Sequence, residues 1–560
     1  MARPPQTVPG PPPLLPPIAP EEHTALVNVL LALLERYRTT DAQLRTVIEH
    51  QHAVIGELEQ RVGALEAEVR RLKNLPARPN LKPSALHPDR DDDDPPTGGG
   101  APGASRKRRR TPKRRKRLKI HHRVVIEPEP VPPGSRFRGY RDFTVQDLLI
   151  EPRNTQYRLA RYETPGGEYL VGKLPDALHD AHFGPTLKSY IVHQYHHQRV
   201  TQPLLLAQLR QWGIDISAGQ LSRLLTERHE PFHQEKDLLL LAGLTSSTYV
   251  HVDDTGARHR GQNGYATHVG NERFAFFAST DSKSRINFLE LLRGPYTDYC
   301  INNAALEYCK QQKLSCAIRE QLRNVDRRHF PDQRAWLAHL NALGVAHALH
   351  RRTATEGALL GSLIEHGLPP ELVILSDDAG QFDVQQHALC WIHAERNFQT
   401  LLPLNDIHTK HLAWVREQLW DLYADLKDYK LNPNTETKLN IDAHFDELCR
   451  TQTRFETLNQ ALKRLHRNKA ELLLVLERPD IPLHNNLSER DIREYVIKRK
   501  ISGSTRSDNG RRARDTFASL KKTCQKLGIG FWDYLLDRFS LTNRIPPLPE
   551  IVAGTASLPP

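Results

Sequence analysis

The sequence predicts an α/β protein in which a mixed sheet is flanked by helices. Two observations favour this class. Runs of β-branched and aromatic residues, such as 248–252 and 273–278, alternate with longer stretches of helical periodicity. The run Leu372–Leu375 is short and wholly apolar, which is typical of a strand buried on both faces. Because 560 residues exceed one ordinary domain, we expect further segments around this core.

The N-terminal region predicts a disordered segment followed by a helix that self-associates. Residues 1–20 are rich in proline, and residues 21–75 have helical character. Apolar residues recur in alternating steps of four and three from Leu44 to Leu72, with Gln51 as the one polar d position. This pattern favours a parallel two-stranded coiled coil, and hence a homodimer or higher oligomer. The alternative is an amphipathic helix that packs on its own chain.

Residues 76–123 predict a linker that carries a basic tract. Segment 106–119 holds eleven Lys and Arg and no acid, and thus nearly all of the formal net charge of +12. The alternative is a solvated, self-repelling tail, but clusters of this density usually contact phosphates. The candidate DNA-binding residues of the tract are Arg106, Lys107, Arg108, Arg109, Arg110, Lys113, Arg114, Arg115, Lys116 and Arg117.

Two small modules are expected next. Residues 124–180 predict a small β-rich module, with strands at 143–145, 157–160 and 169–171. Residues 181–240 predict helices, and within them a helix from Val200, a glycine turn near Gly213 and a second helix capped by Ser217 form a helix-turn-helix layout. Gln220 and Arg223 are its candidate DNA contacts. The same spacing is also common in helical hairpins of protein cores.

Three acidic motifs are spread over the segment 245–540. Asp253 ends an apolar strand, Asp377 ends a second one, and Glu489 lies in the first turn of a basic helix. Three meandering strands (248–252, 273–278 and 286–292) followed by a buried parallel strand suit a ribonuclease-H-like core. A Gly-rich turn (Gly261, Gly264 and Gly270) is expected between the first two of these strands. We expect a helical insertion at about 405–478 and a tail at 541–560. Neighbouring strand ends would place the two Asp side by side.

Each acidic motif also has a purely structural interpretation. Asp before Gly at a strand end is ordinary turn chemistry, and Asn486 with Glu489 forms a good capping box. In combination, three carboxylates suit a site for two Mg²⁺ or Mn²⁺ ions that cuts and joins phosphodiesters. Asp254 and Asp378 lie beside the favoured acids and stay open as alternatives.

Cations and a Cys-x-x-His pair accompany these acids. The cations near Glu489 that we expect to contact DNA phosphates are Arg490, Arg493, Lys498, Arg499 and Lys500. A salt bridge from Arg493 to Glu489 is the structural alternative. Cys390 and His393 have half the spacing of a zinc site, but without a second pair nearby we expect them to pack with Trp391. No structural zinc is expected.

Four of these segments together resemble DDE transposases of the insertion sequence 66 family. They are residues 251–256, 375–382, 390–396 and 485–503, in order along the chain. The resemblance implies a catalytic and metal-binding triad of Asp253, Asp377 and Glu489, because the family motif places its acid first in each doublet. It also implies cleavage at transposon ends and joining to target DNA. The alternatives are an inactive DNA-binding derivative and a metal-dependent nuclease that does not join strands.

Composition restricts the setting. The six cysteines show no C-x-x-C pairs, which fits a reducing compartment. No apolar run approaches the roughly 20 residues that span a bilayer, and the N-terminus lacks the order of a signal peptide. We expect a cytoplasmic, nucleoid-associated protein whose partners are terminal inverted repeats and target DNA. Whether small companion proteins of the same element are needed stays open.

Overall fold

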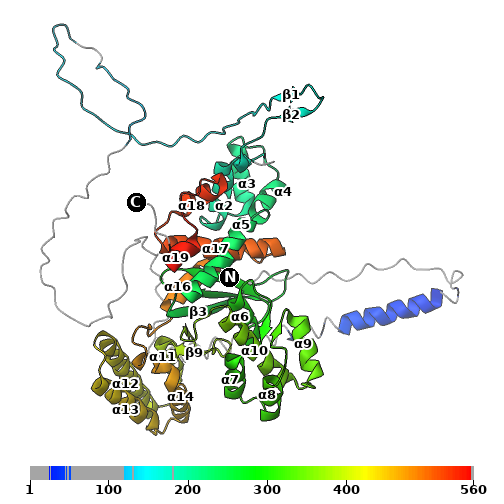
Figure 1. The fold of residues 1–560 in the computed structure, drawn as a ribbon, viewed down its shortest axis with the longest axis vertical. Coiled ribbons are helices and arrows are strands. Elements are labelled where there is room, and N and C mark those ends of the chain that lie inside the picture. Colours follow the sequence, from blue (N-terminus) through cyan, green and yellow to red (C-terminus); the bar gives the residue numbers. More distant parts are fainter. Residues whose placement is uncertain are drawn as a thin grey trace. The chain divides into compact units, whose positions relative to one another are not determined.

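A five-stranded mixed sheet forms the centre of the protein (Figure 1). In the order β5-β4-β3-β8-β9, its first three strands are antiparallel neighbours, whereas β3, β8 and β9 run parallel. This confirms the α/β class. The strands are β3 (Tyr249–Gly256), β4 (Tyr265–Gly270), β5 (Ala275–Thr280), β8 (Val373–Ser376) and β9 (Gln386–Leu389).

The computed structural model describes residues 24, 27–43, 46, 50–51, 119–128, 132–178 and 182–555. The chain divides into two units, Met1–Arg138 and Gly139–Pro560. Within the first unit, residues 27–43 are helical and exposed along most of their length. The Pro-rich segment, nearly all of the heptad positions and the tract Arg106–Arg117 lie outside the described residues.

Two expectations for the meander were wrong. The Gly-rich segment expected as a turn contains β4, whose Tyr265, Thr267 and Val269 are the aromatic and β-branched residues that strands favour. Residues 286–292, expected as a strand, lie in the helix α6 (Arg285–Arg293). The Ser284 hydroxyl accepts a hydrogen bond from the Asn287 N–H at 3.1 Å and caps this helix.

Helix α17 (Asp508–Lys526) covers the edge of the sheet that β5 forms. Three of its side chains, spaced four residues apart, accept hydrogen bonds from backbone N–H groups of β5 at 2.8–3.1 Å; these are Asp515, Ser519 and Thr523. An edge strand otherwise presents unpaired backbone N–H groups, so side chains of α17 accept the hydrogen bonds that a sixth strand would accept. Helix α5 (Glu230–Thr245) packs against α17 and β5.

The connection from β5 to β8 forms a mostly helical layer. It contains α6, a two-stranded antiparallel sheet of β6 (Tyr299–Cys300) and β7 (His329–Phe330), and α10 (Ala348–Glu365), which packs on α6 and α7 (Asn303–Gln311). The helices beyond α6 are α7 (Asn303–Gln311), α8 (Cys316–Arg323), α9 (Gln333–Ala342) and α10 (Ala348–Glu365).

A second helical group follows β9 and has its own apolar core. It occupies the stretch in which we expected a helical insertion, and Figure 1 shows it to one side of the sheet. Its helices are α11 (Trp391–Gln399), α12 (Asp406–Leu431), α13 (Thr435–Arg450), α14 (Glu456–Arg467) and α15 (Lys469–Leu472), followed by the 3-10 turn η3 (Leu474–Leu476).

The segment before the sheet combines a short hairpin with three helices. β1 (Arg161–Glu163) and β2 (Tyr169–Val171) are its only strands in the described residues of 124–180, so residues 143–145 and 157–160 are not strands. The helices are α2 (Pro185–His196), α3 (Gln202–Gln211) and α4 (Ala218–Thr226). Gly213 has φ of 78° in the turn between α3 and α4, a conformation that favours glycine.

The chain ends with α18 (Phe531–Ser540), which packs on α2, and α19 (Leu548–Ala553), which packs on α5. Among the described residues, no helix is both long and apolar enough to cross a membrane.

Candidate active site

Parallel pairing of β3 and β8 brings the first two acids together. The register pairs His251 with Leu375, so a continuation by two residues places Asp253 beside Asp377. β8 ends at Ser376, directly before Asp377, whereas β3 continues beyond Asp253 to Gly256, so the expectation that this strand ends at Asp253 was wrong. The proximity of the two acids therefore follows from the strand order and register.

Helix α16 (Asn486–Ser502) carries Glu489, and its start is held against β3 and β4. The Asn485 side chain donates to the Val252 carbonyl at 2.8 Å and lies 2.9 Å from Nδ1 of His251. One turn later, the Ser488 hydroxyl lies 2.7 Å from Nδ1 of His268. His268 is the cross-strand partner of Asp253. The first turn of α16 thus covers the sheet face that carries Asp253.

Glu489 does not cap its helix. Asn485 occupies the N-cap position without a side-chain capping bond, so the capping box of Asn486 and Glu489, the structural alternative for this motif, is absent. Oε1 of Glu489 instead lies 3.4 Å from His393 Nε2 and 3.4 Å from Arg396 Nη1. The carboxylate is turned toward α11 and remains 25% exposed.

The electrostatics show acids that crowd one another. Burial, together with Asp377, Asp254 and Glu489, raises the pKa of Asp253 to about 7. Burial is also the main cause that raises the pKa of Asp377. One carboxylate oxygen of Asp377, Oδ1, is buried without a hydrogen-bond partner in the part of the chain that the structure describes. A buried, unpaired carboxylate oxygen is costly unless a cation meets it.

The second acid of each doublet has another partner. Asp254 forms an ion pair with Lys283, and its Oδ2 accepts a hydrogen bond from Gln381 at 2.8 Å. Asp378 pairs with Arg464, whose Nε donates at 2.9 Å. Period-2 alternation along β3 turns Asp254 away from the face that α16 covers. Within the described part of the chain, no cationic side chain forms an ion pair with Asp253 or Asp377.

Within residues 390–396, the first two residues pack in the interior and His393 faces the candidate site. Cys390 and Trp391 are buried: the Asn485 N–H donates to Sγ at 3.2 Å, and the Trp391 indole donates to the Leu472 carbonyl at 2.9 Å. This agrees with the expected packing of Cys390 and Trp391 but not of His393, which faces Glu489. His393 and Arg396 are three residues apart on α11, which begins directly after β9. That spacing on one helical face was the signal in the sequence.

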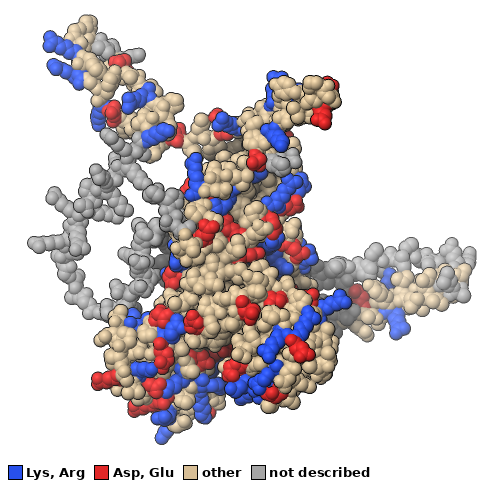
Figure 2. Space-filling view, in the orientation of Figure 1, with Lys and Arg blue, Asp and Glu red and all other residues tan. Residues whose placement is uncertain are grey.

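Several expected DNA contacts are exposed. Arg223 projects from α4, and Arg490, Arg493 and Lys500 lie on the open side of α16. Among the described residues, no ion pair joins Arg493 to Glu489. Arg499 is half-buried and donates to the Thr255 hydroxyl at 3.3 Å. On the face drawn in Figure 2, cations and acids are intermixed rather than gathered into one basic surface.

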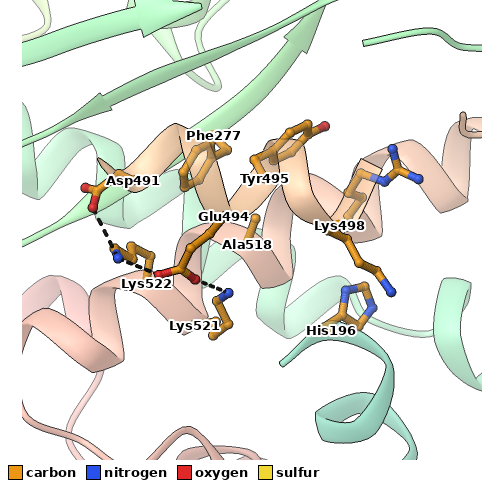
Figure 3. A pocket seen from close by; sticks show the side chains of 10 residues that line it. His196, Phe277, Asp491, Glu494, Tyr495, Lys498, Ala518, Lys521 and Lys522 are labelled. Atoms are coloured by element: carbon orange, nitrogen blue, oxygen red, sulfur yellow. Dashed lines mark hydrogen bonds and ion pairs between the residues drawn. The ribbon is translucent and has the colours of Figure 1, made fainter. Parts of the chain in front are cut away.

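Two expected DNA contacts have other roles. Gln220 forms the capping box of α4, because its side chain accepts from the Ser217 N–H at 2.8 Å. Lys498 is only 7% exposed and donates to the Tyr195 carbonyl at 2.5 Å. Burial lowers its pKa to about 7. Figure 3 shows Lys498 directed toward His196 of α2. The expectation that Lys498 contacts DNA was wrong, because periodicity alone does not show which side of α16 is covered.

Beyond its first turn, α16 is fixed to α17 by ion pairs. Glu494 meets Lys521 at 2.6 Å and Lys522 at 2.7 Å (Figure 3). Asp491 meets Lys522 at 3.3 Å and Lys526 at 2.7 Å. Helix α17 is also hydrogen-bonded to β5. These contacts therefore link the helix that carries Glu489 to the sheet whose strands carry Asp253 and Asp377.

Comparisons with known proteins identify the family of the chain. The sequence model described as Transposase IS66 family matches residues 378–513, a range that includes Glu489 and begins directly after Asp377. The chain is also similar to the uncharacterized protein y4jO of Sinorhizobium fredii, with 45% identity over 321 residues. That similarity covers 57% of this chain and 100% of the relative. The chain belongs to the IS66 family of transposases.

Proposed function

We propose that this transposase cleaves transposon ends and joins the freed 3′-hydroxyl to target DNA, using a metal site of Asp253, Asp377 and Glu489. The unpaired, buried oxygen of Asp377 beside the crowded Asp253 carries the proposal. Carboxylates held together without cationic partners destabilise a protein, and a bound cation removes that cost. The same strand order supports a ribonuclease-H-like core.

The residues fit a hard divalent cation. All three candidate ligands offer carboxylate oxygens, which suit Mg²⁺ or Mn²⁺ rather than a softer metal. When bound by these carboxylates, divalent ions would supply activation of the attacking oxygen and charge stabilisation of the leaving oxygen of a phosphodiester. Strand transfer of this kind requires no covalent nucleophile from the protein, so the chain would contribute chiefly by positioning and by electrostatics.

The surrounding residues set the geometry of the acids. Asn485 ties the start of α16 to β3, which fixes the height of Glu489 above Asp253. Arg396 lies 3.1 Å from His393 Nε2 as well as 3.4 Å from Glu489, so it orients both side chains. We propose that Arg396 and His393 position Glu489 and adjoin the scissile phosphate.

DNA is the proposed partner. Arg223, Arg490, Arg493, Arg499 and Lys500 are the candidate contacts within the second unit, and the basic tract Arg106–Arg117 would add phosphate contacts that weaken with salt. A coiled coil from about residue 44 would join two copies, each holding one transposon end. The proposed location is the bacterial cytoplasm at the nucleoid.

An oligonucleotide assay separates this function from its alternatives. The substrate carries the terminal inverted repeats that flank the gene, with Mg²⁺ present. A transposase gives cleaved and joined products, a nuclease gives only cleavage, and an inactive derivative only binds. Glu489→Gln should abolish cleavage while DNA affinity changes less than about twofold, because the side chain is partly exposed and the isosteric amide keeps its volume. Retained joining in that variant would overturn the assignment.

A further inference from the structure

A second group of metal-ligating side chains lies outside the candidate active site. Cys300 and His329 are cross-strand partners in the two-stranded β6–β7 sheet, and their Sγ and Nε2 atoms lie 3.6 Å apart. Glu365, at the end of α10, brings a carboxylate oxygen to the same place. All three ligand atoms lie within 4.8 Å of one another.

A close approach of the backbones of α10 and β6 brings these side chains together. A Cβ on Gly361 would lie 2.2 Å from the Cys300 carbonyl oxygen, so only glycine permits α10 to pack so tightly on β6. The Asn302 amide donates to the Gly361 carbonyl at 2.9 Å and fixes the contact. Glu365 lies four residues beyond Gly361, on the same helical face. Helix α10 therefore places Glu365 beside β6 and β7.

The three side chains differ in burial in a way that suits a bound ion. Cys300 is 2% exposed, whereas His329 and Glu365 are open to solvent. An ion could thus reach the buried sulfur from one side, and water could complete its coordination. The neighbouring acid Asp298 is not available, because its Oδ1 already contacts His366 at 2.9 Å and Ser362 at 3.1 Å.

We propose that Cys300, His329 and Glu365 bind Zn²⁺ or a similar borderline-soft divalent ion, with a fourth position open to water. In a tetrahedral site, Zn–S of about 2.3 Å and Zn–N of about 2.05 Å separate the two ligand atoms by about 3.6 Å. The observed Sγ–Nε2 distance has this value. The mixed sulfur, nitrogen and oxygen set excludes a preference for Mg²⁺, which takes oxygen ligands and water.

A weak hydrogen bond between the thiol and the imidazole is the competing explanation for the Cys300–His329 distance. It does not account for the approach of Glu365, whose carboxylate would have no partner in that interaction. In the proposed site, the metal replaces the thiol proton, which is released to solvent, and all three side chains become ligands. The ion would then link the β6–β7 sheet to α10 through its ligands.

Cobalt titration of the full-length chain, stripped of metal by chelation, tests the site. Co²⁺ bound to a thiolate gives a sulfur-to-metal charge-transfer band in the near ultraviolet, which an all-carboxylate site cannot give. We expect one such band per chain, displaced by Zn²⁺. Cys300→Ser should abolish it, and His329→Gln and Glu365→Gln should weaken Co²⁺ affinity at least tenfold. The last two residues are exposed, so these variants should keep the metal-free melting temperature.

Matched controls assign the band to this cluster. Cys316→Ser removes an exposed thiol and should leave the band unchanged. Cys390→Ser removes the sulfur of the Cys390–His393 pair and should also leave it unchanged. Glu489→Gln should retain the band, so the fate of the proposed transposase site is scored separately. The proposal is overturned if the folded wild-type chain gives no band, or if the band survives His329→Gln and Glu365→Gln at undiminished affinity.

Discussion

Replacing Asp253 by Asn tests whether the metal-free site holds charge at a cost in stability. Burial and the neighbouring carboxylates raise the pKa of Asp253 from 3.8 to about 7. Between these values the carboxyl is protonated in the folded chain and ionised in the unfolded chain. The free energy of unfolding of the wild type therefore falls as the pH rises through this window. At about 1.36 kcal/mol per pKa unit, the full shift corresponds to at most about 4 kcal/mol.

Asn has nearly the same shape as Asp and does not titrate. In a chelating buffer, we expect the melting temperature of Asp253→Asn, relative to wild type, to rise from about pH 4 to pH 7 and then to stay constant. Scanning calorimetry of both proteins at each pH isolates the residue, because all other groups are shared. Added Mn²⁺ should stabilise the wild type at pH 8 and leave the variant unchanged.

Asp254→Asn is the matched control for this experiment. It loses the ion pair with Lys283, and its melting temperature should not rise with pH relative to wild type. A difference between Asp253→Asn and wild type that does not depend on pH would refute the reasoning. So would a metal-free variant that is less stable than wild type at pH 8.

Three further outcomes follow from the contacts of the site. Asn485→Ala removes the side-chain partner of two groups of β3, and we expect it to lower the free energy of unfolding by about 2–4 kcal/mol and to reduce cleavage. Asn486→Ala should change neither the melting temperature nor cleavage, and equal effects of the two variants would contradict the positioning role of Asn485. Lys498→Met should leave DNA affinity in a filter-binding assay unchanged, whereas Arg493→Ala should weaken it about threefold or more, and a loss confined to the Lys498 variant would reverse this assignment. Deletion of 106–119 should lower both DNA affinity and its salt dependence, and an unchanged salt slope would show that the tract makes no phosphate contacts.

Local sequence signals predicted the parts of the fold that depend on local chemistry. Ser217 caps α4 as its position indicated, and Gly213 takes the left-handed turn before it, whereas the part of Gln220 in this cap was not predicted. The strand that carries Asp253 and the strand that ends just before Asp377 also follow from their β-branched and apolar residues, although β3 continues to Gly256, beyond its expected end at Asp253. The choice of the first acid in each doublet came from the family resemblance, and in the structure the other two acids are bound to Lys283 and Arg464.

The remaining features depend on contacts between distant segments. β4 was missed because its flanking glycines suggest a turn, and only pairing on both sides makes this segment a strand. Lys498 was misassigned because the helix that covers it lies three hundred residues earlier in the chain. The spacing of His393 and Arg396 places them on one helical face, but the role of His393 was missed because nothing in the local sequence shows that α11 and α16 meet. Side-chain direction on a helix becomes informative only when its neighbour is known.

Metal preference in cysteine variants tests the central claim most directly. Asp377→Cys replaces one candidate ligand by sulfur, which binds Mn²⁺ better than Mg²⁺, and Asp378→Cys is the adjacent control. With DNA that carries the transposon ends, we predict that Asp377→Cys cleaves nothing in Mg²⁺ and recovers part of its activity in Mn²⁺. The control should cleave with either ion. Full activity of Asp377→Cys in Mg²⁺, or a Mn²⁺ requirement that appears only in Asp378→Cys, would contradict the assignment of Asp377 to the metal.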